Sequence, residues 1–241
     1  IAALDLARAQ GLHLPIVCNT GGYETVESVH AWRGFIDIWL ADLKYVSPAL
    51  SAELSAAPDY FAQARPAIEA MMAQAGHPVF DSEGILQRGV ILRHLALPGH
   101  VDDSFAVLDQ MAAWNKADPG CFLPSVMSQY TPFYQAADHG IGRRITTYEY
   151  RRVVNYAMDL GLSSGYMQQN SSAKEEYTPS FDLTGVLTPP SSLRDSFVKT
   201  TKISFSFSLG RNSICLLSGA LCGIMDTTMC SHMKWIPETT F

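Results

Sequence analysis

The feature that most limits what this chain can fold into is the alternation of short apolar runs with segments of helical period over residues 1–170. Runs at 14–19, 36–40 and 90–97 are nearly continuously apolar, and stretches with apolar residues three or four apart lie between them. Strands of this kind are typical of a parallel sheet joined by helices. About five strands are expected, too few for a closed eight-stranded barrel. We therefore predict an α/β domain, with an open doubly wound sheet as the structural alternative.

The start of one helix carries a local signal of its own. Thr146 is followed three residues later by Glu149, and an apolar pattern of helical period begins there. This spacing is that of a capping box, in which the two side chains bond each other's backbone N–H groups. A helix starting at Thr146 is therefore expected.

A change of composition near Val186 indicates a domain boundary. Residues 187–208 are rich in Ser and Thr, and the apolar stretch at 212–225 is only 14 residues long, whereas a membrane-spanning helix needs about 20. We predict a domain over 1–186 and a tail over 187–241 that is poorly ordered or unrelated in sequence, with a genuine second module as the alternative. The chain begins at Ile1 inside a helix-like run, which favours a domain that lacks its N-terminal strands and leaves 14–19 as an exposed sheet edge.

Composition excludes some classes of protein. The net charge is −6, which argues against a general nucleic-acid binder, because phosphate binding usually needs a basic face. No membrane partner is expected. The chain has five cysteines and no secretory signal pattern, which favours a reducing compartment and a cytoplasmic location.

Polar residues gather where the expected strands end, which is where ligands bind in parallel α/β folds. Asp42 and Lys44 end the second run and lie on one side of an extended segment. Each has a purely structural alternative: Asp42 with Lys44 as an ordinary ion pair, Arg93 as the neutraliser of a nearby carboxylate, and His94 as a satisfied core residue. Together they favour a polar ligand site. The candidates, with Gln129 from a strand-like run at 126–130, are Asn19, Thr20, Gly21, Asp42, Lys44, Arg93, His94 and Gln129.

Four segments, at 14–23, 37–45, 93–99 and 127–132, occur in an order and spacing that resemble a known family. They are similar to the radical S-adenosylmethionine proteins related to the pyruvate formate-lyase activating enzyme. Residues 181–186, Phe-Asp-Leu-Thr-Gly-Val, resemble the usual C-terminus of that subfamily. The resemblance covers 1–186 and implies the C-terminal part of a partial (β/α)6 barrel, followed by an irregular C-terminal tail.

The resemblance also implies cofactors and site residues. Family members bind a [4Fe-4S] cluster, and S-adenosylmethionine chelates its unique iron and is cleaved to a 5′-deoxyadenosyl radical. By this comparison Asn19, Thr20 and Gly21 lie near S-adenosylmethionine. Asp42 and Lys44 meet its ribose and methionine carboxylate, and a lysine suits a carboxylate as a compact charge. Arg93 and Gln129 line the same pocket.

The cysteines depart from the family pattern. The Cys-x3-Cys-x2-Cys loop that holds the cluster is absent, and Cys215, Cys222 and Cys230 are spaced too widely to replace it. Cys18 stands where the subfamily usually has Tyr, so it is not expected to be a ligand. No metal ligand is therefore assigned, and this chain alone is expected to be inactive and to bind no cluster in the family's way.

The leading hypothesis is a fragment of an iron-sulfur enzyme of the glycyl-radical-enzyme-activating type. The resemblance implies a protein substrate and a reductant such as flavodoxin or ferredoxin. The first alternative is a barrel lyase or aldolase that uses Lys44 as a Schiff base, although a neighbouring Asp42 would favour the charged, non-nucleophilic amine. The second alternative is a non-catalytic fragment that serves in binding.

Overall fold

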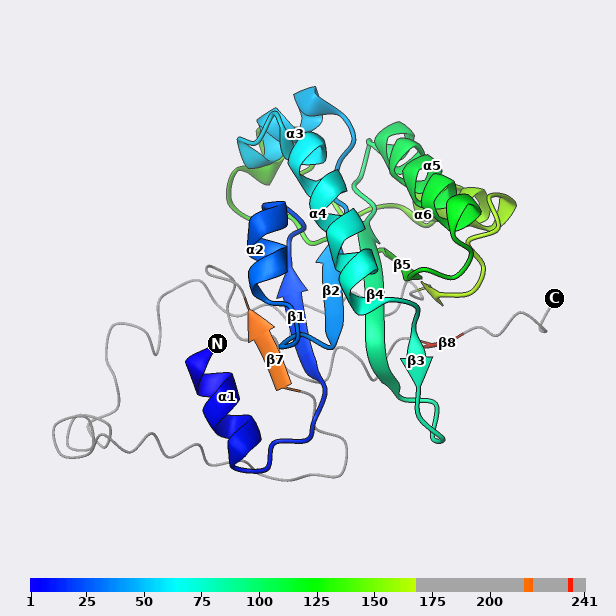
Figure 1. Cartoon of the computed structure of the whole chain (residues 1–241). Helices are drawn as coiled ribbons and strands as arrows, with labels where there is room; N and C mark the ends of the chain where they lie inside the picture. Colours follow the sequence, from blue (N-terminus) through cyan, green and yellow to red (C-terminus); the bar gives the residue numbers. More distant parts are fainter. Residues whose placement is uncertain (168–214, 219–233, 236–241) are drawn as a thin grey trace, which may run out of the picture.

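The structure, a computed structural model, describes residues 1–167, 215–218 and 234–235 (Figure 1). The helices are α1 (Ala2–Ala9), α2 (Val26–Ala31), α3 (Pro48–Ser55), α4 (Tyr60–Ala75), α5 (Val101–Ala117) and α6 (Thr147–Asp159), with a 3-10 helix η1 (Tyr134–Ala137). The strands are β1 (Ile16–Thr20), β2 (Ile38–Asp42), β3 (Val79–Phe80), β4 (Leu86–Leu95), β5 (Leu123–Met127), β6 (Tyr166–Met167), β7 (Cys215–Ser218) and β8 (Lys234–Trp235). None of the described helices is both long and apolar enough to cross a bilayer.

The centre of the fold is a parallel sheet whose strands follow one another in chain order. β1, β2, β4, β5 and β6 are neighbours in that sequence, each pairing in parallel with the next. The short β3 pairs antiparallel with β4 as a hairpin. β7 extends the sheet in parallel beside β1, and β8 pairs antiparallel with β6.

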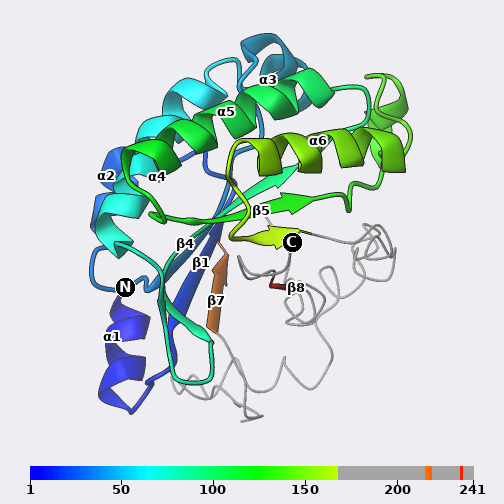
Figure 2. The ribbon, with the colours of Figure 1, turned by 90° about the vertical axis from the view of Figure 1, so that its right-hand side faces the viewer.

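The helices that connect these strands cover one face of the sheet. Figure 2 shows α2, α4, α5 and α6 on the same side of the sheet, and Figure 1 shows α3 beyond the ends of the strands. An open doubly wound sheet has helices on both faces and a reversal of strand order, and neither occurs in the described chain. The α/β prediction is thus confirmed, and the sequential order is consistent with a partial α/β barrel.

Alternation along the strands divides the apolar side chains between the two faces. The helix-covered face carries the main core, in which Ile16, Trp39 and Val90 are at most 2% exposed. The opposite face carries a smaller cluster built on Val17 and Ile38. Within the described ranges, no helix lies on that second face (Figure 2).

Two local predictions have clear outcomes. The capping box is confirmed, because Thr146 accepts from the N–H of Glu149 while the Glu149 carboxylate accepts from the N–H of Thr146. The strand expected at 126–130 is instead β5, which begins at Leu123 and ends at Met127. Pro124 and Ser125 interrupt the apolar pattern in the first half of β5, although all five residues of the strand are buried.

The tail contributes to the sheet at two short places. β7 lies within the apolar stretch at 212–225 and pairs with β1 from Ile16 to Asn19. The edge of β1 is therefore covered, and the exposed edge expected at 14–19 is not found. The predicted boundary near Val186 lies outside the described residues, as does most of 187–241.

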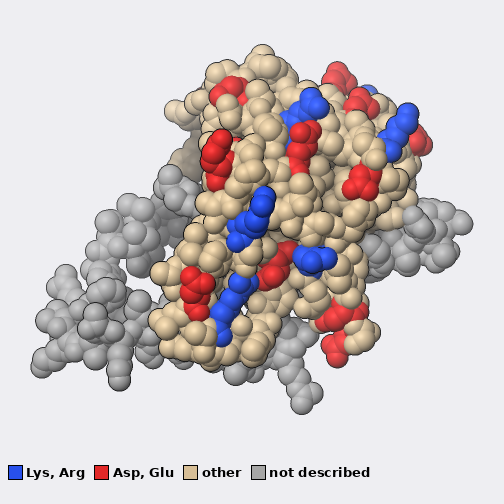
Figure 3. Space-filling view, in the orientation of Figure 1, with Lys and Arg blue, Asp and Glu red and all other residues tan. Residues whose placement is uncertain are grey.

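Charged side chains do not form a single-sign surface on the face seen in Figure 3. Lys and Arg alternate there with Asp and Glu across the helices.

Candidate functional site

Three of the predicted site residues form one hydrogen-bonded network on the sheet. Arg93 of β4 donates from Nε to Asp42 Oδ1 at 2.7 Å and from Nη2 to Asn19 Oδ1 at 2.6 Å. The three residues come from three adjacent strands, and Arg93 lies in register with Asp42. The network lies on the face without a helix, because its residues alternate with those that pack into the helix-covered core.

The network is largely shielded from water. The side chains of Arg93 and Asp42 are 11% and 22% exposed, so the guanidinium must be paired or used. Ser125 of β5 is in register with Arg93 on the same row and is fully buried, and its hydroxyl has no hydrogen-bond partner in the described structure. The Ser125 hydroxyl, beside Arg93 on the same face of the sheet, is therefore able to form a further hydrogen bond.

Tyr60 of α4 holds together the loops that follow β1 and β2. Its hydroxyl accepts from the backbone N–H of Lys44 at 3.0 Å and lies 2.8 Å from the carbonyl of Gly21 and 2.9 Å from that of Asp42. Burial is the main cause that raises the pKa of the Tyr60 hydroxyl far above its ordinary value. The hydroxyl therefore stays protonated and donates to one of the two carbonyls.

Gly22 allows these two loops to approach each other closely. Its φ is +79°, and a Cβ at this position would overlap the carbonyl oxygen of Asp42. Both properties favour glycine, since L residues rarely adopt this conformation and no side chain fits. The turn at Gly21 and Gly22 thus brings the end of β1 against the end of β2.

Lys44 lies at the same edge of the sheet, outside the network. Its ammonium is 3.5 Å from the position of a Cβ built on Gly21, so it lies beside that glycine's backbone. The side chain is exposed. The ion pair of Asp42 is with Arg93, and none between Asp42 and Lys44 is found in the described part of the chain.

Thr20 and Gln129, two further predicted residues, are placed differently. Thr20 is 6% exposed, and its hydroxyl donates to Glu24 and accepts from the N–H of Gly22, so it shapes the turn. The Gln129 amide lies 3.7 Å from the sulfur of Met127. No described contact joins Gln129 to the Arg93 network, and its predicted role in the pocket stays a prediction.

His94 fits its structural alternative. It is buried on the helix side, and its ring nitrogens are bonded to the carbonyl of Leu43 and the hydroxyl of Ser104. Burial lowers the pKa of the imidazole and keeps it neutral. Asp103 accepts from the N–H groups of Val46 and Ser47. His94 and Asp103 both bond to the loop after β2, which contains Lys44, and hold it in place.

The described cysteine side chains make no metal site. Burial is the main cause that raises the pKa of Cys18 to about 11, and its side chain packs against the helix-covered core. Cys121 is buried in the same core. No group of three His, Cys, Asp or Glu side chains suited to a metal ion occurs among the residues searched, which are the described ones.

Sequence reasoning missed Ser125 and Tyr60. Ser125 lies in a stretch that does not look like a strand, but its position opposite Arg93 is readable once β5 is placed. Tyr60 begins a helix far from the loops in sequence, and no local pattern connects it with them.

Glu149 secures the loop that follows β4. Its carboxylate accepts from the N–H of Gly99 at 2.9 Å and from both terminal nitrogens of Arg143 at 2.7 Å, in addition to its capping bonds with Thr146. The Arg143 guanidinium is the main cause that holds the pKa of Glu149 well below its usual range. The Glu149 carboxylate thus connects the start of α6 to the turn at Gly99, which follows β4.

We expect Glu149→Ala to lower the free energy of unfolding by about 2 kcal/mol at pH 7, since it loses a helix cap and charged hydrogen bonds. Because the folded pKa is depressed, the stabilisation is complete above the unfolded value of about 4.3 and is lost as the pH falls further. Urea unfolding at pH 7 and pH 3 measures this difference. Glu27→Ala, in the first turn of α2, is the matched control, and a difference for Glu149→Ala that is the same at both pH values would contradict the assignment.

Comparison with known proteins adds little to this geometry. No protein-family model matches the sequence. An uncharacterized protein of Methanocaldococcus jannaschii is similar to this chain, with 28% identity over 155 residues. The alignment covers 64% of this chain and 41% of the relative, so the chain spans less than half of that protein's length.

Proposed function

We propose that the described sheet is the C-terminal part of a partial (β/α)6 radical S-adenosylmethionine barrel within a longer enzyme of the glycyl-radical-enzyme-activating type. The observation that carries the proposal is the network of Asn19, Asp42 and Arg93, on the sheet face that none of the described helices covers. These are three of the residues that the resemblance assigns to S-adenosylmethionine. Residues from separate segments are joined in one polar cluster, which supports a shared ligand.

The chemistry of the cluster fits S-adenosylmethionine. Both contacts from Arg93 to Asp42 are to Oδ1, which leaves Oδ2 to accept from a ribose hydroxyl. The exposed ammonium of Lys44 is suited to the methionine carboxylate. The orphan hydroxyl of Ser125 offers a further donor or acceptor. When bound at a reduced iron-sulfur cluster, S-adenosylmethionine supplies a 5′-deoxyadenosyl radical.

The described residues do not fit the cluster itself. Cys18 and Cys121 lie in the helix-covered core rather than beside the Arg93 network. In this proposal the cluster ligands come from a Cys-x3-Cys-x2-Cys loop upstream of residue 1 in the longer protein. No step of the reaction is therefore assigned to a residue of this chain beyond binding and orienting S-adenosylmethionine. The reductant and the protein substrate follow from the family resemblance.

The test compares residues 1–241 with a chain extended upstream by its natural coding sequence. Both are reconstituted anaerobically with iron and sulfide and then given dithionite and S-adenosylmethionine. We expect 5′-deoxyadenosine, measured by chromatography, from the extended chain and none from residues 1–241. An extended sequence without the cysteine loop, or product from residues 1–241 alone, would refute the proposal.

The Schiff-base alternative depends on Lys44. Lysines that form Schiff bases are activated by burial or by a neighbouring cation, whereas the Lys44 side chain is exposed. Borohydride trapping of a carbonyl substrate on Lys44, detected by mass spectrometry, would favour this alternative over the radical enzyme.

A further inference from the structure

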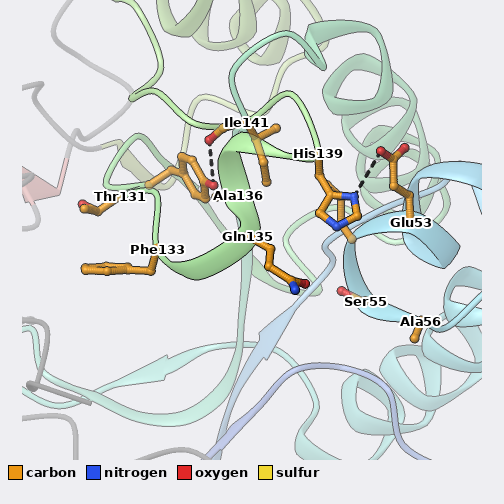
Figure 4. A pocket seen from close by; sticks show the side chains of 11 residues that line it. Glu53, Ser55, Ala56, Thr131, Phe133, Gln135, Ala136, His139 and Ile141 are labelled. Atoms are coloured by element: carbon orange, nitrogen blue, oxygen red, sulfur yellow. Dashed lines mark hydrogen bonds and ion pairs between the residues drawn. The ribbon is translucent and has the colours of Figure 1, made fainter. Parts of the chain in front are cut away.

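A cavity lies beyond the carboxyl ends of the strands, and no residue of the Arg93 network lines it. Its volume is about 470 Å³, within the range of small-molecule pockets. One wall is the end of α3, with Glu53 and Ser55, and the other is the segment 130–141 with η1. Figure 4 shows Gln135 and His139 extending from this segment toward the α3 wall.

Unusual backbone conformations occur at both walls. Ala56 (φ +52°) and Tyr134 (φ +48°) have positive φ, and no other non-glycine residue in the described ranges does. Ala56 lines the cavity and ends α3, while Tyr134 lies between the lining residues Phe133 and Gln135. Strained residues concentrate at ligand sites because their surroundings must impose the conformation. Tyr134 is the stronger case, since an aromatic residue rarely adopts this region.

One side-chain contact joins the two walls, and another closes the 130–141 segment on itself. His139 Nδ1 lies 3.4 Å from Glu53 Oε1, which joins the loop to α3. The hydroxyl of Tyr130 donates to the carbonyl of Ile141 at 3.0 Å and closes the loop on itself. Both walls of the cavity are thus linked through His139 and Glu53 without a ligand.

The lining residues define the charge and polarity of a ligand. No Lys or Arg lines the cavity, and the single carboxylate, Glu53, already faces His139. The one basic group of the lining, the His139 imidazole, already faces Glu53, so an anionic ligand would lack a free counterion. Within the described structure, the side chains of Gln135 and Thr131 have no hydrogen-bond partner, and Phe133 is 41% exposed. The cavity thus offers amide and hydroxyl groups beside aromatic surface.

We propose that this cavity binds an uncharged aromatic compound that carries amide or hydroxyl groups. The aromatic part packs on Phe133 and Tyr130, and the polar groups bond to Gln135 and Thr131. None of these residues belongs to the Arg93 network, so the inference goes beyond the proposed function and does not depend on it. A free small molecule and an aromatic residue within a polypeptide share this chemistry.

Titration of the full chain with three probes tests the proposal. N-acetylphenylalaninamide is neutral, N-acetylphenylalanine has the same body with a carboxylate, and a blocked pentapeptide has phenylalanine at its centre. Binding is measured by NMR chemical-shift titration. We expect the neutral amide to bind at least about tenfold more tightly than the anion, the cost of an unpaired charge. Equal binding of the two would overturn the proposal. If the pentapeptide binds more tightly than the neutral amide, the proposal is supported and the natural ligand is an aromatic residue of a polypeptide. If the two bind equally, the proposal is supported and the natural ligand is a small molecule.

Variants locate the binding in the cavity. Ala136→Phe places a ring in the cavity, and Ala73→Phe, at an exposed position of α4, is its matched control. We expect the first to weaken binding of the amide at least about tenfold and the second to leave it unchanged. Gln135→Ala and Thr131→Val remove hydrogen-bonding groups without adding bulk, and keep the test valid if Ala136→Phe does not fold. Unchanged binding in these two variants and in a folded Ala136→Phe would overturn the proposal.

Discussion

Replacing Arg93 with alanine is expected to lower the free energy of unfolding by about 3 kcal/mol, because a buried carboxylate is left without its partner. The side chains of Arg93 and Asp42 keep 11% and 22% of their exposure, which places the effect near the lower end of the range for buried pairs. Asn19 also loses its donor. Chemical denaturation at pH 7 measures the change. S-adenosylmethionine binding by the upstream-extended chain should fall at least about a hundredfold, because the two hydrogen bonds by which the guanidinium positions Asp42 and Asn19 are lost.

A double variant separates a structural ion pair from a ligand site. Arg93→Met combined with Asp42→Leu replaces both charges with apolar side chains, and such exchanges often restore stability. We expect recovery of most of the lost free energy, but no recovery of S-adenosylmethionine binding. Recovery of both would show that Arg93 only neutralises Asp42, which is the structural alternative raised from the sequence.

Gly22→Ala is expected to be destabilising by about 2–4 kcal/mol, since it combines left-handed backbone strain with overlap in a packed region. The residue has φ of +79°, and the overlapping atom is the carbonyl oxygen of Asp42, which cannot rotate away as a flexible side chain would. Relief requires the loops after β1 and β2 to separate. Urea unfolding measures the loss of stability.

Gly34→Ala is the matched control, because it measures the cost of placing alanine at positive φ without any steric overlap. Gly34 has φ of +81°, and a Cβ there would meet no atom within 4 Å. Only the conformational cost of about 1–2 kcal/mol is then expected. If both variants lose the same stability, the close approach of the two loops is not what requires glycine at position 22.

Much of the fold follows from local sequence patterns. Nearly continuous apolar runs predicted the central strands, and Thr146 with Glu149 predicted the start of α6. β5 was misplaced because Pro124 and Ser125 interrupt its apolar pattern, although burial on both faces makes the segment a strand. The side chains of Pro124 and Ser125 do not reveal this burial, since it depends on residues that are distant in the sequence.

The sequence predicted the residues of the candidate site, but it predicted their contacts only in part. Asn19, Asp42 and Arg93 were chosen because they lie at or near the ends of successive strands, and parallel pairing brings such positions to one edge. The choice of partner could not be read from the sequence. Asp42 is two residues from Lys44 and 51 from Arg93, yet strand register makes the distant arginine its partner.

The sequence by itself determined the class of the fold, because periodicity and capping act over a few residues and need no distant contact. It also determined which residue types are available at the carboxyl edge. Only the tertiary structure decided that Arg93 bonds to Asp42 and Asn19, that Tyr60 joins two loops, and that β7 covers the edge of β1. These contacts join residues far apart in the chain, and the register and packing of the folded sheet select them from many sterically reasonable pairs.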